Sequence, residues 1–183
     1  MDEGVEKAQS IIIDTNVIFS SLVKREGYTQ AVLSILLSQK DIKILVPSTI
    51  KTEILTHIHE ISKKSGLPEP LLRNFLTVIL RDMKVVDEAL YREDIIRAFD
   101  FVKDKKDSPF CGLAIRNSPS IILTYNKRHF DADKLKMIGV EVLEPKELVN
   151  YMEYEIMTDK KVKKKGGIYR ILSRLYLLKK VKL

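Results

Sequence analysis

The stretch Ile-Ile-Ile-Asp-Thr-Asn-Val (residues 11–17) says most about how this chain folds. Three consecutive β-branched residues predict a short strand that is buried on both faces, as in a parallel sheet. Asp14 directly follows this strand, at the place where open parallel sheets carry their ligand sites. An Asp at such a place also commonly caps the next helix. Taken alone, this stretch is compatible with a ligand site and with a simple helix cap.

Four further runs rich in β-branched residues follow, separated by stretches in which apolar residues recur with helical spacing. Strands are expected at residues 11–13, 42–46, 83–86, 121–124 and 140–143, and helices at 17–22, 31–37, 50–61, 71–80, 95–102, 110–115 and 148–156. Strands that alternate with helices indicate a three-layer α/β/α domain with a mostly parallel sheet of about five strands.

The charge of the 183-residue chain is unevenly distributed. The formal net charge is +7, but ten of the 32 Lys and Arg residues lie within residues 160–183, which contain no Asp or Glu. The rest of the chain is therefore mildly acidic. We predict one domain at residues 8–157, followed by a basic amphipathic helical tail at 158–183. Such asymmetry is typical of an arm that meets an anionic partner.

Several classes of protein are disfavoured by composition. The single cysteine, Cys111, excludes an intramolecular disulfide, and three histidines make a closed structural zinc site difficult to assemble. No stretch approaches the ~18 consecutive apolar residues of a membrane span, and the N-terminal residues are too acidic for a secretory signal. We therefore expect a cytoplasmic protein without a membrane span.

Two further carboxylates fall where they can reach the same edge of the sheet as Asp14. Glu53 lies early in the helix after the second strand, which Ser48 or Thr49 can cap, and most Glu residues on such helices are simply solvated. Asp107 precedes Ser-Pro at a helix start, where stabilisation of the helix end alone can explain it.

The strand at residues 121–124 runs directly into a polar segment, Tyr-Asn-Lys-Arg-His-Phe-Asp (residues 125–131). Thr124 and Asn126 offer neutral oxygens beside the acidic residues. Asn126 can alternatively cap the next helix, and Phe130 is better interpreted as a core residue than as a platform for a nucleic-acid base. His129 has only a weak claim to a role in the site.

Taken together, these pieces resemble the PIN-domain nucleases. The matching segments are IIIDTNV (11–17), PSTIKTEI (47–54), KDSPFCGLA (106–114) and ILTYNKRHF (122–130), which span most of the chain although each is short. The resemblance implies that Asp14, Glu53 and Asp107 bind metal, and that Asn16 and Thr124 support them. Many family members carry a fourth acid in the last segment, where this chain has Asn126, a ligand without charge. Asp131 lies nearby as a supporting acid.

The function that the resemblance implies is a metal-dependent endoribonuclease. Oxygen ligands suit Mg²⁺ or Mn²⁺, which activate water to hydrolyse a phosphodiester bond. Since an acidic site repels phosphate, single-stranded RNA must be held by cations around it. The expected RNA-binding residues are Lys127, Arg128, Lys163, Lys164, Lys165, Arg170 and Arg174. A homodimer and the toxin of a toxin–antitoxin pair, with an antitoxin as partner, are further expectations from the resemblance.

Alternatives remain open at this stage. The apolar stripe of the tail can pack on the protein's own core or on a second subunit instead of serving an RNA-binding arm. An inactive PIN fold that binds RNA or a partner without cutting is a non-enzymatic alternative, favoured by the missing fourth acid. An aspartyl phosphatase needs a second Asp two residues after the first, where this chain has Asn16, and a signalling receiver needs an acidic neighbour of Asp14.

Overall fold

A five-stranded, fully parallel sheet forms the centre of the protein in the computed structural model, which describes residues 10–24, 27–38 and 42–150. The strand order is β3-β2-β1-β4-β5. The strands are β1 (Ser10–Ile13), β2 (Lys43–Pro47), β3 (Lys84–Val86), β4 (Ser120–Leu123) and β5 (Val140–Leu143). The predicted three-layer α/β/α fold and its five strands are confirmed.

The direction in which successive strands are added to the sheet reverses beside β1. From β1 the chain runs outward through β2 to β3, and then crosses to β4 and β5 on the other side. Ile11 of β1 is in register with Ile44 of β2 and with Ile121 of β4. In open parallel sheets, ligands bind beyond the carboxyl ends of the strands where the winding reverses. That place lies between the ends of β1 and β4.

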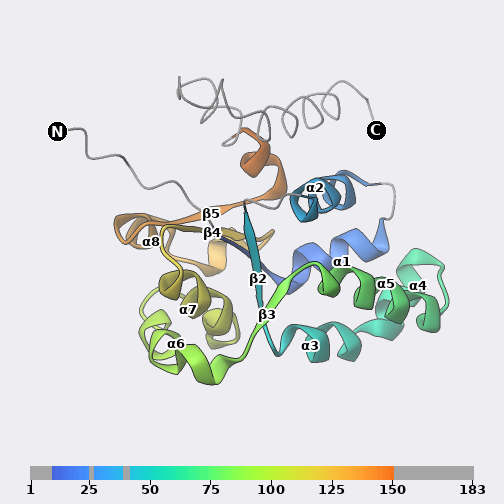
Figure 1. Ribbon diagram of the computed structural model, residues 1–183, viewed down its shortest axis with the longest axis horizontal. Coiled ribbons are helices and arrows are strands. Elements are labelled where there is room, and N and C mark those ends of the chain that lie inside the picture. Colours follow the sequence, from blue (N-terminus) through green and yellow to red (C-terminus); the bar gives the residue numbers. More distant parts are fainter. Residues whose placement is uncertain (1–9, 25–26, 39–41, 151–183) are drawn as a thin grey trace.

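Helices cover both faces of this sheet. Figure 1 shows α6 and α7 on one side of β2 and β3, with α1 to α5 on the other. The helices are α1 (Thr15–Val23), α2 (Tyr28–Leu37), α3 (Ile50–Thr56), α4 (Ile58–Ser65), α5 (Glu69–Arg81), α6 (Arg92–Ala98), α7 (Ser108–Arg116) and α8 (Ala132–Met137). Three short 3-10 helices complete the set: η1 (Glu88–Tyr91), η2 (Lys105–Asp107) and η3 (Lys127–His129). A further helix begins at Pro145 and continues to the end of the described residues.

Two predicted helices differ from the observed ones. The helix expected at residues 50–61 is divided into α3 and α4, because the backbone of His57 leaves the helical region at φ −101° and ψ 11°. The helix expected at residues 95–102 starts earlier, at Arg92, and ends at Ala98. Val102 instead forms an antiparallel bridge with Phe130, so tertiary pairing replaces the helical hydrogen bonds expected there.

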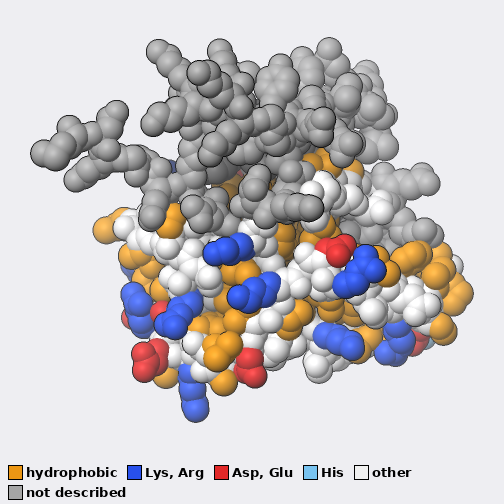
Figure 2. All heavy atoms as spheres, viewed as in Figure 1, with side chains coloured by type: hydrophobic (Ala, Val, Ile, Leu, Met, Phe, Trp, Pro, Cys, Tyr) orange, Lys and Arg blue, Asp and Glu red, His pale blue; other side chains and the backbone are white. Residues whose placement is uncertain are grey.

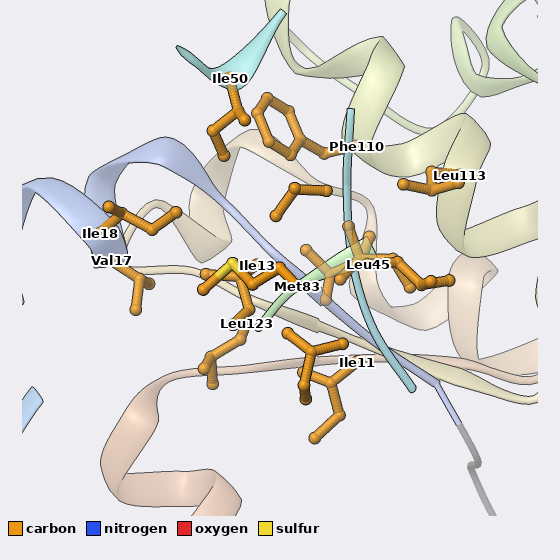
Figure 3. Close-up of a cluster of buried hydrophobic side chains, with 14 of the residues drawn as sticks. Ile11, Ile13, Val17, Ile18, Leu45, Ile50, Met83, Phe110, Leu113 and Leu123 are labelled. Carbon is orange, nitrogen blue, oxygen red and sulfur yellow. The ribbon is translucent and has the colours of Figure 1, made fainter. Parts of the chain in front are cut away.

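The core lies between the central strands and the helices that pack on them (Figure 3). Ile13 and Leu123 are fully buried beside Val17 of α1, while Phe110 of α7 is buried on the other side. Burial of each side chain of this size contributes about 1.5–3 kcal/mol. The residues that emerge from β1 and β4 are therefore held on a well-packed base.

Helix α7 packs unusually closely against α6 at Gly112. A Cβ added at Gly112 would lie 2.7 Å from the backbone N of Ile95, so a side chain here would push the helices apart. Because α7 also contacts β1, β2 and β4, its position relative to the sheet is tightly defined. This matters for Asp107, which lies at the N-terminus of α7.

The predicted tail at residues 158–183 lies outside the described residues, as do Lys163, Lys164, Lys165, Arg170 and Arg174. On the face of the described part seen in Figure 2, Lys and Arg side chains are scattered among neutral and apolar ones and form no single basic patch. Within the described ranges, no helix is both long and apolar enough to cross a membrane.

Candidate active site

Asp14 is a buried carboxylate at the carboxyl edge of the sheet, with only 4% of its surface exposed. Its backbone N–H donates to the carbonyl of Leu123 at 3.0 Å, so it continues the pairing of β1 with β4. Asp14 also occupies the N-cap position of α1, but its side chain makes no capping hydrogen bond. Helix capping therefore does not account for the position of this carboxylate, although the backbone N–H groups of Asn16 and Thr15 still lower its pKa.

The Asp14 carboxylate is held instead by two neutral donors. The Thr124 hydroxyl and the Asn16 side-chain amide each donate to Oδ2 at 2.6 Å. The Asn16 amide oxygen in turn accepts from the backbone N–H of Tyr125 at 3.0 Å, and Thr124 is fully buried. This network joins the ends of β1 and β4 and fixes the orientation of Asp14. Asn16 and Thr124, which were predicted to support the acids, both donate to Asp14.

The environment of Asp14 is unfavourable for a bare negative charge. Its pKa is raised to about 6, mainly because of burial; the nearby Asp107 carboxylate also raises it, while the Thr124 hydroxyl and the backbone N–H groups of Asn16 and Thr15 lower it. An isolated Asp with no compensating cation loses much of its charge in such a place. A cation bound at Asp14 would reverse this preference and keep the carboxylate ionised.

Asp107 approaches the same edge from α7. It is the last residue of η2 and the N-cap of α7, yet its side chain makes no capping bond. Its Oδ2 lies 2.8 Å from Nδ1 of His129. Burial raises the pKa of Asp107, while the hydrogen bond from His129 acts in the opposite direction. Asp107 is therefore a second carboxylate in a partly desolvated position.

Glu53 joins this group through Thr15. The Thr15 hydroxyl donates to Oε2 of Glu53 at 2.5 Å, and Thr15 is the chain neighbour of Asp14. Thr49 is the N-cap of α3 without a side-chain capping bond, so Glu53 lies in the first turn. Ser48 does not cap α3 either, since its hydroxyl donates to Glu88. The three acids predicted from the sequence thus belong to one region of the structure.

The side chains do not form a ready-made ligand cage. Within the described ranges, no group of three or more His, Cys, Asp or Glu side chains is arranged closely enough to hold a metal ion. The donors around Asp14 are nevertheless carboxylate, hydroxyl and amide oxygens, which suit hard cations such as Mg²⁺ or Mn²⁺. The raised pKa of Asp14 fits a site completed by a cation, so the residues present are compatible with such an ion.

The other predicted site residues lie around this group with different partners. The backbone N–H of Asn126 donates to the Thr124 hydroxyl at 2.9 Å, which places Asn126 beside the network. Asp131 caps α8 and pairs with Lys134, whose hydrogen bond lowers the pKa of Asp131. In the described part of the chain, Asp131 makes no hydrogen bond to Asp14, Glu53 or Asp107.

The two described cations that were expected to bind RNA differ from each other. The ammonium of Lys127 lies 2.8 Å from both carboxylate oxygens of Glu147, so much of its charge is compensated within the protein. Arg128 is exposed on η3. Of the two, Arg128 is better placed to meet an anionic ligand.

Two participants were not singled out by sequence reasoning. Thr15 was quoted only as part of a motif, although it is the donor to Glu53. His129 was given a weak claim, although it is the partner of Asp107. The only available signal was proximity along the chain to Asp14 and to Asn126. Neither contact can be inferred from spacing, because each joins segments more than 20 residues apart.

The PIN domain family matches residues 12–130, which include every acid of the site. The chain therefore belongs to the PIN-domain family, a family of nucleases that generally use divalent metal ions.

Among solved structures, the chain is similar to one described as VapBC2 from Rickettsia felis bound to a DNA fragment from their promoter. The identity is 16%, the TM-score is 0.46, and the match covers 74% of this chain and 98% of the other. No curated protein matches the chain.

Proposed function

We propose that this protein is a metal-dependent endoribonuclease that uses Mg²⁺ or Mn²⁺ to hydrolyse RNA phosphodiester bonds. Membership of the PIN-domain family supports nuclease chemistry. The observation that carries the proposal is Asp14: a buried carboxylate with a pKa raised to about 6, clamped by Thr124 and Asn16 where the sheet reverses its winding. A structural carboxylate would normally have a compensating cationic partner at this depth.

The side chains divide the work of such a site. Asp14, Glu53 and Asp107 would hold the ion, with Asn126 as a neutral oxygen donor beside them. A bound divalent ion supplies an activated water and neutralises charge on the phosphodiester. Thr124 and Asn16 keep Asp14 in one orientation, and Thr15 does the same for Glu53. Attack of that water on phosphorus would break the bond to the 3′ oxygen and would leave 5′-phosphate and 3′-hydroxyl ends.

The RNA itself requires cations outside the acidic site. Arg128 is the exposed cation closest in sequence to Asn126. The basic tail at residues 158–183, with Lys163, Lys164, Lys165, Arg170 and Arg174, is the larger candidate reservoir of positive charge. Single-stranded RNA is the proposed substrate.

Incubation of the purified full chain with labelled single-stranded RNA tests the proposal. Cleavage should occur with Mn²⁺ or Mg²⁺, stop with EDTA, and be lost in Asp14→Asn. Asp133→Asn is a matched control, because Asp133 is an exposed acid on α8 outside the site. Cleavage that survives Asp14→Asn would contradict the site, and metal-independent cleavage would contradict the mechanism.

A second candidate function is RNA or partner binding by a PIN fold that does not cut. Two observations favour it: Asn126 takes the place of a fourth acid, and the described side chains form no complete metal cluster. The same experiment separates the two functions, because RNA binding without cleavage under any metal condition would support this one.

Several expectations stay predictions: a homodimer, an antitoxin partner, a cytoplasmic location and the boundary between domain and tail. A chain that ends at Asp159, compared with the full chain by mass in solution and by RNA affinity, tests the tail. If the tail is an RNA-binding arm, RNA affinity falls. If it is a dimerisation element, the mass halves.

A further inference from the structure

His129 lies in the last motif, three residues after Asn126, which stands where many family members carry a fourth acid. Asn126 offers no charge, and Asp131 is engaged with Lys134 and with the N-terminus of α8. The His129 ring instead reaches Asp107, with 2.8 Å between Nδ1 and Oδ2. Among the described residues, this is the side-chain hydrogen bond that joins the last motif to Asp107.

The backbone holds His129 in this place from two sides. Its N–H donates to the carbonyl of Asn126 at 2.9 Å, and its carbonyl accepts from the N–H of Lys103 at 2.8 Å. The next residue, Phe130, is buried and forms the bridge to Val102. The His129 side chain is 29% exposed and that of Asp107 is 14% exposed, so the contact is partly shielded from water. The backbone on both sides of His129 therefore fixes the position from which its ring contacts Asp107.

The chemistry of the two groups decides which one donates the hydrogen bond between His129 and Asp107. An ionised carboxylate only accepts hydrogen bonds, so Nδ1 of His129 carries the proton and donates to Oδ2. This bond uses one acceptor position of Oδ2 and leaves Oδ1 and the remaining acceptor capacity of the carboxylate available. Hydrogen bonds from outer residues orient the carboxylates that bind metal ions, and their loss typically costs 10–100-fold in metal affinity.

We infer that His129 is a positioning residue: it orients the Asp107 carboxylate toward a divalent ion through the bond from Nδ1 to Oδ2, without binding the ion itself. The inference rests on the proposed function, since it takes Asp107 as a metal ligand. The site of this chain then differs from one with a fourth carboxylate in the last motif. A fourth carboxylate would add negative charge, whereas His129 orients Asp107.

The test measures Mn²⁺ binding by the full chain, from the paramagnetic resonance signal of free Mn²⁺ at one fixed pH. His129→Ala should raise the Kd for Mn²⁺ by about tenfold. His129→Asn should keep the Kd close to the wild-type value, because the Asn amide can donate from nearly the same place as Nδ1. His59→Ala is the matched control: His59 also contacts a carboxylate, that of Glu69 at 3.3 Å, but on an exposed surface of α4.

Two further measurements separate a positioning role from other roles. Urea unfolding in EDTA reports whether His129→Asn folds as wild type, so that its Mn²⁺ affinity can be compared directly. Electron spin echo modulation of bound Mn²⁺ reports whether an imidazole nitrogen is coordinated, and no such coupling should appear.

The outcomes distinguish failure of the inference from failure of the proposed function. Unchanged affinity in His129→Ala overturns the inference alone, as does an affinity that His129→Asn, once folded, fails to restore. Nitrogen coupling to bound Mn²⁺ also overturns it, by making His129 a ligand. Absence of Mn²⁺ binding in the wild-type chain would overturn the proposed function and the inference together.

Discussion

Asp14 and Asp107 are both N-cap residues, of α1 and α7, but their surroundings differ. Neither carboxylate makes a capping bond. Asp14 continues an extended strand and receives two neutral donors, whereas Asp107 ends a 3-10 helix and meets an imidazole. Burial raises both pKa values, but only Asp107 has a partner that can carry positive charge. Of the two carboxylates, Asp14 would therefore depend more strongly on a bound cation.

The largest expected effect is on cleavage. Asp14→Asn should reduce the rate by on the order of 10³-fold, because a lost charge contact with a catalytic ion is worth several kcal/mol. Asp107→Asn should reduce it less, since Asp107 is less buried and keeps the His129 contact. Single-turnover cleavage of labelled RNA at saturating Mn²⁺ measures both. Equal losses, or a larger loss at Asp107, would contradict the difference between the two carboxylates.

The second prediction concerns stability and pH in EDTA. The folded pKa of Asp14 is about 6, above its ordinary 3.8, so between these values the folded state binds more protons than the unfolded state. The contribution of Asp14 to the free energy of unfolding should therefore fall as pH rises from about 4 to 6 and then level off. The cost at pH 7 is about 3 kcal/mol, the free-energy equivalent of this pKa shift.

Asp14→Asn should remove that cost and be more stable than wild type at pH 7.5, by up to about 3 kcal/mol. Urea unfolding of both proteins at pH 4.5 and pH 7.5 measures the difference, with other titrating groups common to the two chains. A variant that is no more stable than wild type at pH 7.5 would show that the ionised Asp14 carboxylate does not destabilise the folded state.

The third prediction concerns the neutral donors of Asp14. Thr124→Val removes the hydroxyl that donates to Asp14 and that accepts from the N–H of Asn126. The unpaired groups should cost about 1–3 kcal/mol of unfolding free energy. Thr77→Val is the control, because the Thr77 hydroxyl bonds only within an exposed helix. Urea unfolding is the measurement, and equal losses in the two variants would contradict a special role for Thr124.

The smallest expected effects lie at the rim. Arg128→Ala should reduce the slope of log affinity against log salt concentration by about 0.7. This is the value for one phosphate contact to a single strand. Lys127→Ala should change the slope less, because Glu147 already compensates Lys127. Fluorescence anisotropy across a salt series, in EDTA, gives both slopes. A larger change for Lys127 would mean that RNA displaces Glu147.

Much of the fold could be predicted from local sequence. Each of the five expected strands is present, because β-branched residues such as those at 11–13 favour strands. Helix limits were less well predicted, since neither the division at His57 nor the end of α6 at Ala98 was expected. The bridge from Val102 to Phe130 joins residues 28 positions apart, and no local pattern announces it.

What the sequence by itself determined is the alternation of strands and helices, with Asp14 directly after a strand, Glu53 early in the helix after a strand, and Asp107 at the start of a later helix. These follow from periodicity and from the parallel sheet, which brings strand ends to one edge. Only the tertiary structure decided the partners: Thr124 for Asp14, Thr15 for Glu53, His129 for Asp107, and Glu147 for Lys127. Hydrogen bonds of this kind form only if segments far apart in the sequence are positioned to within a few tenths of an ångström. Packing of the whole domain sets those positions.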